Sequence, residues 1–424
     1  MTNDMTRGRI LPQLISFTIP LVLGNLFQLT YNAADSMIVG RYLGGQALAA
    51  VGTAGPIMNL AILFISGMCM GAGILMSTQY GAKQQDVLER QISTTLLSGL
   101  VFSFFVTLSM MVLAKPVLTL IRVPEEILDS ACGYLRIIFT GFLFTFAYNF
   151  FSSTLRALGD SKASLYFLVI SSVFNIAGDL LFVAVFRWGV NGSALATVLS
   201  QMICCLCCMI YIQKKVPLLR LGKRWLIFDK RLLSRTFSFG ITSALQLMCV
   251  QLGKVCVQSM VNMQGIAFMA AFTAVNRVDD FALTPQQNIA HAATTFMAQN
   301  KGAGQEKRMK QGFFCGVLVE LCYTAAVGSC VFLFAEPIMK LFLPEESAEV
   351  IVLGVTYLQL ISFLYLLSGS GNIVQGFFRG IGDLKVTLIS SLLNISVRVI
   401  AVFFMLQVSN GGFGCLAWAC CFGW

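Results

Sequence analysis

The 424-residue chain is 57% hydrophobic and 11% charged, with a mean hydropathy of +0.79. No soluble core needs this much apolar sequence, so the composition excludes an ordinary soluble domain and indicates a protein surrounded by lipid. The net charge of +10 is also typical of nucleic-acid-binding proteins, but these basic residues follow a membrane pattern, and no nucleic acid is expected as a partner.

Eleven apolar stretches are long enough, at about 20 residues, to cross a bilayer. In chain order, the predicted spans are 14–39, 46–76, 91–114, 130–155, 163–186, 190–212, 236–262, 267–298, 311–335, 350–377 and 387–408. The final apolar stretch, 411–424, matches the start of the sixth span but has only about 13 residues, so we expect a truncated twelfth helix. The first span leaves no room for a separate cleavable signal.

The Lys and Arg residues are concentrated on one side of these spans. With a cytoplasmic N-terminus, 20 of the 29 lie in segments on the cytoplasmic side. The outer loops contain only Arg41, Lys115, Arg122, Arg187 and Lys340. This asymmetry follows the positive-inside rule and predicts a multi-pass protein of the plasma membrane, with its basic side facing the cytoplasm and anionic lipid.

One sequence motif occurs twice. Arg156–Lys162 returns as Arg379–Lys385, and each copy precedes an apolar segment that contains an Asn, at 175 and at 394. Because the repeat shift covers six spans, both halves enter the membrane in the same orientation. We therefore expect an all-α polytopic membrane protein with two six-helix lobes related by a pseudo-two-fold axis along the membrane normal. The predicted parts are an N-terminal lobe at 1–212, a basic cytoplasmic connector at 213–235 and a C-terminal lobe at 236–424.

Acidic residues lie inside two spans of the first lobe, where a carboxyl group is costly and is therefore a functional candidate. Asp35 is in the outer half of the first span, and Asp179 is in the fifth, one turn after Asn175 on the same helix face. Asn149 and Thr197, in the fourth and sixth spans, add further oxygens. Such a group can bind and release a proton, or hold a hard cation such as Na⁺. The alternative is a structural polar network.

The second lobe is basic at comparable positions. Arg398 follows Asn394 as Asp179 follows Asn175, and Lys254 lies within about one turn of the repeat position of Asp35. These residues, with Arg277 and Asp280, are candidates for substrate binding. Alternatively they form salt bridges within the lobe, for example Arg277 or Lys254 with Asp280 or Glu320.

Pro20 interrupts the first span, where it removes a backbone hydrogen bond and permits a bend. A bend controlled by protonation of Asp35 would be a gate, whereas a static kink is the alternative.

The sequence contains no nucleotide-binding loop, nucleophile triad or metal cluster, so neither an enzyme nor an ATP-driven pump is predicted. The 14 cysteines include the run Cys204-Cys205-Leu206-Cys207-Cys208, which lies in an apolar span without a nearby His or carboxylate. We interpret these cysteines as packing residues, with palmitoylation near the cytoplasmic end as the alternative. No metal and no cofactor other than the coupling ion is expected.

These features together resemble the multidrug and toxic compound extrusion (MATE) family. The resemblance rests on Ile19–Leu21, Ala34–Gly40, Gln79–Ala82, Arg156–Asp160, Asn175 with Asp179, Gln299–Ala303 and Asn394 with Arg398. It implies a V-shaped pair of six-helix lobes that exports organic cations and drugs in exchange for H⁺ or Na⁺. It also implies a cation-site role for Asp35, Asn149, Asn175, Asp179 and Thr197, and a bending role for Pro20.

A NorM-like branch of this family uses an acidic residue in the seventh span, where this chain has Lys254. The resemblance therefore favours a DinF-like or MepA-like branch, coupled through the first lobe. The alternative function is a flippase for a lipid-linked oligosaccharide or related anionic lipid, which unpaired Lys254 and Arg398 would favour. We expect a monomer whose partners are small cationic or amphipathic molecules and membrane lipids.

Overall fold

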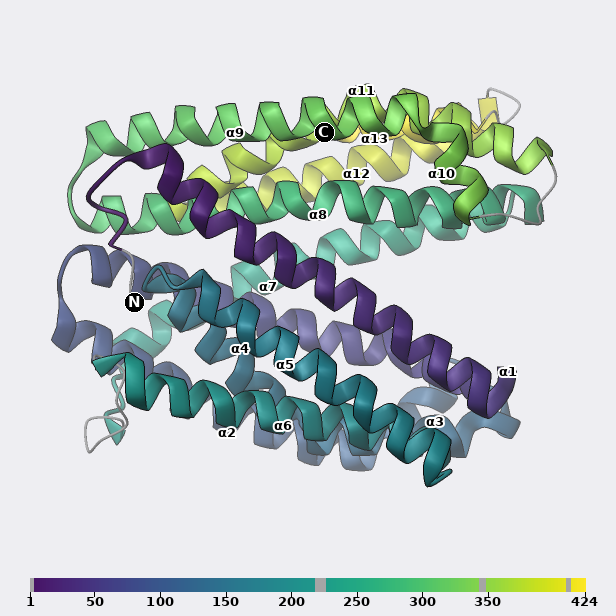
Figure 1. Cartoon of the computed structure of the whole chain (residues 1–424), viewed down its shortest axis with the longest axis horizontal. Coiled ribbons are helices and arrows are strands. Elements are labelled where there is room, and N and C mark those ends of the chain that lie inside the picture. Colours follow the sequence, from purple (N-terminus) through teal and green to yellow (C-terminus); the bar gives the residue numbers. More distant parts are fainter. Residues whose placement is uncertain (1–3, 218–225, 343–347, 409–412) are drawn as a thin grey trace. The chain divides into compact units, whose positions relative to one another are not determined.

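The computed structural model describes residues 4–217, 226–342, 348–408 and 413–424, which are almost entirely helical (Figure 1). Residues 218–225 of the predicted connector lie outside the described residues. In chain order, the helices are α1 Ile10–Gly81, α2 Gln85–Leu120, α3 Glu125–Thr140, α4 Phe142–Ala157, α5 Ser161–Asp179 with the π-helical turn η1 Leu180–Val185, α6 Gly189–Lys215, α7 Lys230–Asn262, α8 Ile266–Gly302, α9 Glu306–Leu333, α10 Ala335–Phe342, α11 Ala348–Gly380, α12 Leu384–Val408 and α13 Gly414–Gly423.

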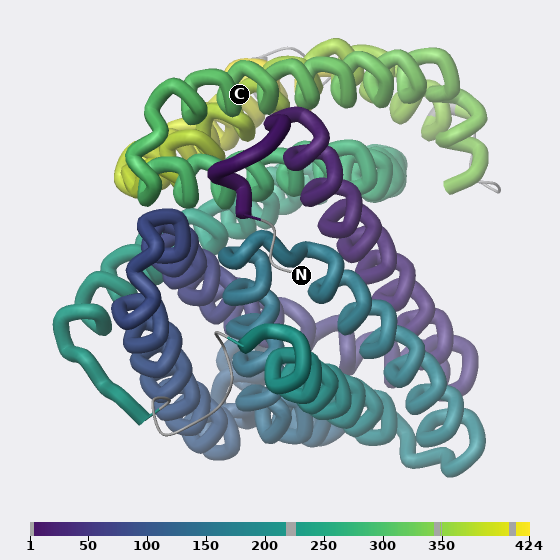
Figure 2. The backbone as a smooth tube through the Cα atoms, turned by 60° about the vertical axis from the view of Figure 1, so that its left-hand side comes forward, coloured from purple at the N-terminus to yellow at the C-terminus, as the bar shows by residue number. Residues whose placement is uncertain are grey.

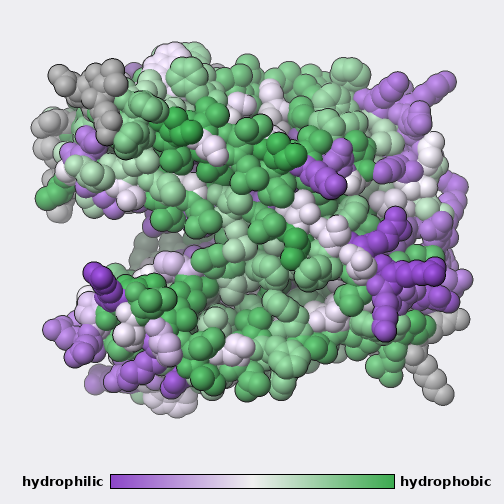
Figure 3. Space-filling view, turned by 180° about the vertical axis from the view of Figure 1, so that it is seen from behind, coloured by the Kyte–Doolittle hydropathy of each residue, from purple (hydrophilic) through white to green (hydrophobic). Residues whose placement is uncertain are grey.

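The helices agree with the predicted spans. Among the described residues, eight helices are long and apolar enough to cross a membrane, or nine if α3 and α4, bent by 47°, count as one span. The first two predicted spans both lie in the 72-residue α1, which is broken at Gly44, where φ is 83°. On the face shown in Figure 3, hydrophobic side chains cover the middle of the helices and hydrophilic ones gather at their ends. The predicted fold class, an all-α polytopic membrane protein, is confirmed.

Contacts divide the chain into two compact units. Unit 1 contains Ile19–Ala244, and unit 2 contains Leu245–Trp424 together with Met5–Thr18. In these units, the first half of α7 packs with unit 1 and the start of α1 packs with unit 2. The lobe boundaries at 212 and 236, which follow from the sequence repeat, stay a prediction.

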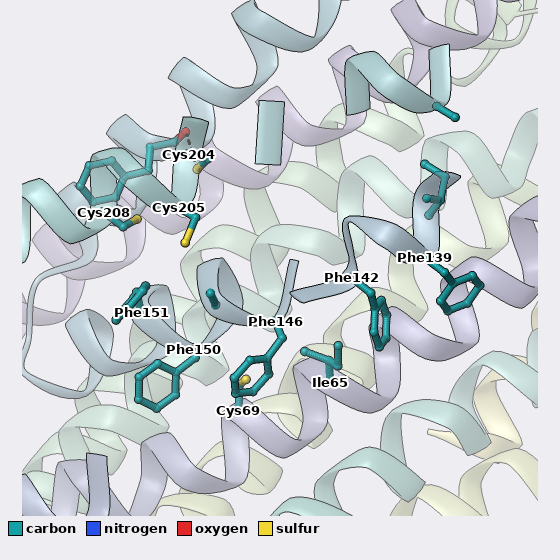
Figure 4. Packing of buried hydrophobic residues seen from close by; sticks show 14 of the residues in the cluster. Ile65, Cys69, Phe139, Phe142, Phe146, Phe150, Phe151, Cys204, Cys205 and Cys208 are labelled. Carbon is teal, nitrogen blue, oxygen red and sulfur yellow. Dashed lines mark hydrogen bonds between the residues drawn. The ribbon is translucent and has the colours of Figure 1, made fainter. Parts of the chain in front are cut away.

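Each unit has its own hydrophobic core. In unit 1, Figure 4 shows Phe142, Phe146 and Phe150 of α4 beside Ile65 and Cys69 of α1. The same cluster includes the cysteines of α6 predicted to be packing residues, of which Cys204, Cys205 and Cys208 are buried. The core of unit 2 is formed mainly by side chains of α8, α11 and α13.

The repeated motif forms the same turn in both units. Gly159 and Gly382 end their helices with φ of 85° and 84°, a conformation that favours glycine. The Asp that follows each glycine caps the next helix: Asp160 Oδ1 accepts from the Ala163 amide at 3.1 Å, and Asp383 Oδ1 from the Val386 amide at 3.4 Å. The sequence repeat is therefore a helix stop followed by a helix start.

An N-terminal clamp holds the first described residues of the chain against the turn between α8 and α9 in unit 2 (Figure 2). The Arg308 guanidinium donates to the backbone carbonyls of Met5, Arg7 and Gly8 and to Oε1 of Gln13, over 2.8–3.2 Å. The backbone N–H of Met5 donates to Gln299 Oε1 at 3.0 Å. The side-chain Nδ2 of Asn300 donates to the backbone carbonyl of Met5 at 3.2 Å. We use the term N-terminal clamp for this set of contacts.

Unit 1 has a comparable contact at the entrance to α7. The carbonyl of Ile227 accepts from Ser93 Oγ at 2.8 Å, and the Asp229 amide donates to Thr94 Oγ1 at 3.1 Å. Ile227 occupies nearly the position that the repeat shift assigns to Met5. The segment that precedes the first helix of each repeat therefore packs against the first turns of a third helix.

We expect Arg308→Lys to release the N-terminal clamp, because one ammonium cannot bond in the planar fork that Arg308 uses. The loss of charge-assisted hydrogen bonds is worth about 2 kcal/mol, or roughly a 30-fold shift toward the undocked segment. Trypsin should then cleave purified protein faster at Arg7 and Arg9. Arg90→Lys, at an exposed position on α2, is the matched control. Equal cleavage rates in all three proteins would show that Arg308 does not hold the segment.

Candidate functional site

The polar cluster of unit 1 is built around two carboxyl groups. Ser193 Oγ of α6 donates to Asp35 Oδ1 of α1 at 2.9 Å. Asp179, at the end of α5, is completely buried, with Asp35 and Ser193 as its polar neighbours. Neither oxygen of Asp179 makes a hydrogen bond. The structure therefore brings the two predicted acids together from helices that are far apart in the sequence.

Asn175 and Thr197 extend this cluster along α5 and α6. Asn175 is buried, and its Nδ2 donates to Thr197 Oγ1 at 3.2 Å, whereas its Oδ1 has no hydrogen-bond partner. Asp179 lies one turn further, where α5 changes into the π-helical turn η1. Such π-helical turns frequently occur at functional sites, because they change the direction of the side chains around them.

Asn149, the remaining predicted member, makes its hydrogen bonds elsewhere in unit 1. Its Nδ2 donates to the Thr145 carbonyl at 2.8 Å, and its Oδ1 accepts from Ser66 Oγ at 3.4 Å. Among the described residues, these bonds link Asn149 to the second half of α1 and to its own helix. They do not connect it with Asp35 or Asp179.

Sequence reasoning missed three members of the cluster: Tyr31, Tyr134 and Ser193. Tyr134 is buried and lies within electrostatic reach of Asp35, Asp179 and Tyr31. Tyr31 precedes Asp35 by one turn and Ser193 precedes Thr197 by one turn, so helical spacing was a signal for both. No pattern in the sequence indicated Tyr134, because its position depends on how α3 packs in the unit.

Pro20 lies inside α1, two residues after the segment Met5–Thr18 that belongs to unit 2. The chain thus passes from one unit to the other within a turn of this proline. The backbone remains helical through Pro20, and the non-helical angles of α1 are at Gly44. A gating role for Pro20 stays a prediction.

In unit 2, three of the predicted residues form or approach ion pairs. Lys254 Nζ is 3.1 Å from Asp280 Oδ1, with both side chains about half exposed, at 51% and 44%. Arg398 lies within electrostatic reach of Asp279. Asp279 is buried and accepts hydrogen bonds from the hydroxyls of Tyr365 at 2.6 Å and Tyr357 at 3.1 Å. The two tyrosines, both on α11, were not anticipated from the sequence.

Arg277, the fourth predicted residue of unit 2, lines a surface cavity of about 410 Å³. The other lining residues are largely apolar and come from α8 and α10: Ile266, Met269, Ala270, Thr273, Ala274 and Phe342. Arg277 is therefore placed at an open surface rather than with Lys254 and Asp280.

Comparisons with known proteins agree with this architecture. The MatE family model matches residues 20–181 and 242–404, one segment in each half of the chain. The probable multidrug resistance protein YpnP of Bacillus subtilis strain 168 is 32% identical over 93% of this chain and 88% of its own length. The probable multidrug resistance protein YoeA of the same organism is 30% identical over 96% of this chain and 89% of its own.

Solved structures show the same fold at lower identity. The crystal structure of MATE in complex with MaL6 has a TM-score of 0.93 at 22% identity, over 99% of this chain and 94% of that one. An outward-facing multidrug resistance MATE family transporter has a TM-score of 0.93 at 21% identity, over 100% of this chain and 94% of that one. With a family model that matches both halves and relatives at 30% identity or above, the chain belongs to the multidrug and toxic compound extrusion (MATE) family.

Proposed function

We propose that this MATE-family efflux transporter is a secondary active antiporter, which exports organic cations and drugs in exchange for H⁺ or Na⁺. One observation carries the proposal: Asp179 is fully buried, makes no hydrogen bond and lies beside Asp35. Two carboxylates at this depth cannot both stay ionised at low cost without a bound cation or proton. The cluster thus has a chemical reason to take up an ion.

The oxygens of the cluster suit either coupling ion. A single proton shared between Asp35 and Asp179 removes the repulsion between them. Alternatively, both carboxylates together with Asn175 Oδ1 and Thr197 Oγ1 supply the hard oxygen ligands that Na⁺ prefers. An organic cation that competes for the same negative charge would be released as the ion binds, and this competition couples the two movements.

The flippase alternative has less support. It required unpaired cationic groups in the second half, but Lys254 forms an ion pair with Asp280, and Arg398 lies beside Asp279. A negative headgroup would have to displace these acids. We therefore keep organic cations as the proposed substrates.

The test is transport in proteoliposomes loaded with ethidium, under a proton gradient and, separately, a sodium gradient. We expect one of the two gradients to drive ethidium against its own gradient, and liposomes without protein to show no such movement. If neither gradient drives any of several organic cations, antiport is wrong. Movement of a fluorescent anionic lipid between leaflets would instead support the flippase.

We also propose that the N-terminus is cytoplasmic, because most Lys and Arg lie on that side. Lys215→Cys, at the end of α6, should then react with an impermeant maleimide only after cells are permeabilised. Leu120→Cys, at the exposed outer end of α2, is the control and should react in intact cells. Labelling of both is measured relative to the unaltered protein, which has 14 cysteines of its own. Labelling of Lys215→Cys in intact cells would contradict a cytoplasmic N-terminus and indicate the opposite topology.

A further inference from the structure

A carboxyl group that the proposed coupling site does not use lies in the middle of α9. Glu320 is at the centre of the 28-residue helix Glu306–Leu333, which is long and apolar enough to cross the membrane. Its side chain is 1% exposed, and neither carboxylate oxygen makes a hydrogen bond. Glu320 is therefore placed near the bilayer midplane, away from both water and lipid.

The surroundings of Glu320 are polar but neutral. A Cβ atom at Gly369 of α11 would be 2.7 Å from Glu320 Oε1 and 2.9 Å from Thr324 Oγ1, so the glycine leaves room for both groups. From α8, Gln286 Nε2 donates to Thr324 Oγ1 at 3.5 Å and to the Tyr365 carbonyl at 3.3 Å. Asn372 Nδ2 of α11 donates to Gln286 Oε1 at 3.4 Å. These amides and hydroxyls come from all three helices around the carboxyl group.

Titratable groups near Glu320 on these helices have other partners. Tyr323, the titratable neighbour on α9, donates its hydroxyl to the Ala282 carbonyl at 3.0 Å. On α8, Asp279 is held by Tyr357 and Tyr365, and Asp280 pairs with Lys254. Among the described residues, no Lys, Arg or His acts on Glu320. An ionised carboxylate here would be unpaired and therefore strongly disfavoured.

We propose that Glu320, with Thr324 and Gln286, is a second proton-binding site, loaded and unloaded by unit 2 during transport. In the state described here, Glu320 is a neutral carboxylic acid. Unloading breaks its O–H bond and transfers the proton to water that enters between α9 and α11. The hydroxyl of Thr324, to which the Gln286 amide donates, is the donor placed to hydrogen-bond the carboxylate that remains. The role in transport rests on the proposed antiport, whereas the protonation of Glu320 does not.

Infrared titration of the reconstituted protein tests the protonation directly. A buried carboxylic acid gives a carbonyl band that a carboxylate lacks, and we expect Glu320→Gln to lose one such band at neutral pH. Glu336→Gln is the matched control: the hydrogen bond from Lys340, at 2.6 Å, lowers the pKa of this exposed carboxyl, which is ionised at neutral pH. Identical carbonyl bands in the wild type and Glu320→Gln, from acidic to alkaline pH, would overturn the proposal. If Glu320→Gln does not fold, Glu320→Asp must shift the band instead.

The ratio of protons to ethidium tests the role in transport. We expect Glu320→Gln to export ethidium with one proton fewer per cycle than the wild type, seen as a shift in the gradient at which net movement stops. An unchanged ratio would overturn the transport role. If wild-type protein moves no ethidium under either ion gradient, the proposed antiport fails. The infrared result then decides separately whether Glu320 holds a proton.

Discussion

Asp35→Asn and Asp179→Asn are each expected to abolish ion-driven export while leaving insertion and folding intact. The amide keeps the shape of the carboxyl group but removes the negative charge that binds the ion. Because Asp179 is buried without a hydrogen bond, its replacement by a neutral group should not cost stability. Export of ethidium should fall to the level of liposomes without protein.

The matched control for these two substitutions is Asp129→Asn. Asp129 is also an aspartate of unit 1, but its side chain is 88% exposed and it pairs with Lys115 at the surface. Exposed ion pairs contribute little to stability, so both export and thermal stability should stay at wild-type values. Wild-type export by both Asp35→Asn and Asp179→Asn would contradict coupling through unit 1.

Gly71→Leu is expected to prevent unit 1 from folding. Gly67 and Gly71 of α1 face Gly240 and Ala244 of α7, a pair of small-residue patterns that lets the helix backbones touch. A Cβ atom at Gly71 would be 2.5 Å from the Gly240 amide nitrogen and from the Phe239 carbonyl carbon. Backbone atoms cannot rotate away, so the helices must separate at a cost on the order of 3 kcal/mol or more.

This prediction is checked by expression, size-exclusion profile and melting temperature in detergent. Gly52→Leu, on the same helix, is the control, because an added Cβ at Gly52 would meet nothing within 4 Å beyond the backbone of its own helix and its two chain neighbours. We expect Gly52→Leu to purify as the wild type does and Gly71→Leu to aggregate. A monodisperse Gly71→Leu with an unchanged melting temperature would show that the contact between α1 and α7 is not required.

The helical elements could be predicted because lipid imposes simple rules. Spans such as 91–114 and 387–408 are long apolar runs, and each is found within a single helix, α2 and α12. Hydropathy was less informative about the connection between the first two predicted spans. Instead of an ordinary loop, the structure has one helix, α1, that is broken only at Gly44. The positions of the membrane-spanning helices are therefore well predicted from the sequence, because the bilayer requires long apolar segments.

The candidate site was only partly predictable. Helical spacing alone placed Asn175 and Asp179 on one face, and the cost of burying charge singled out Asp35. The contact of Asp35 with Ser193 depends on how α1 and α6 pack, and no local pattern encodes that. For the same reason, the sequence did not predict that Tyr357 and Tyr365 donate hydrogen bonds to Asp279, since they lie 78 and 86 residues from it in the chain. Whether these groups carry the transported ion stays a prediction.

The N-terminal clamp has a consequence for the order in which the chain is built. Met5 is held by Gln299, Asn300 and Arg308. The ribosome synthesises Met5 near the start of translation and these three partners about 300 residues later. At about 5–20 residues per second, roughly 15–60 s of synthesis separate the two ends of this contact. The earliest residues must therefore wait, undocked, until α8 and α9 have been inserted, whereas Ile227 meets a Ser93 that was made long before. This contact of unit 2 thus uses some of the first residues to be synthesised, and it cannot form until most of the chain has been made.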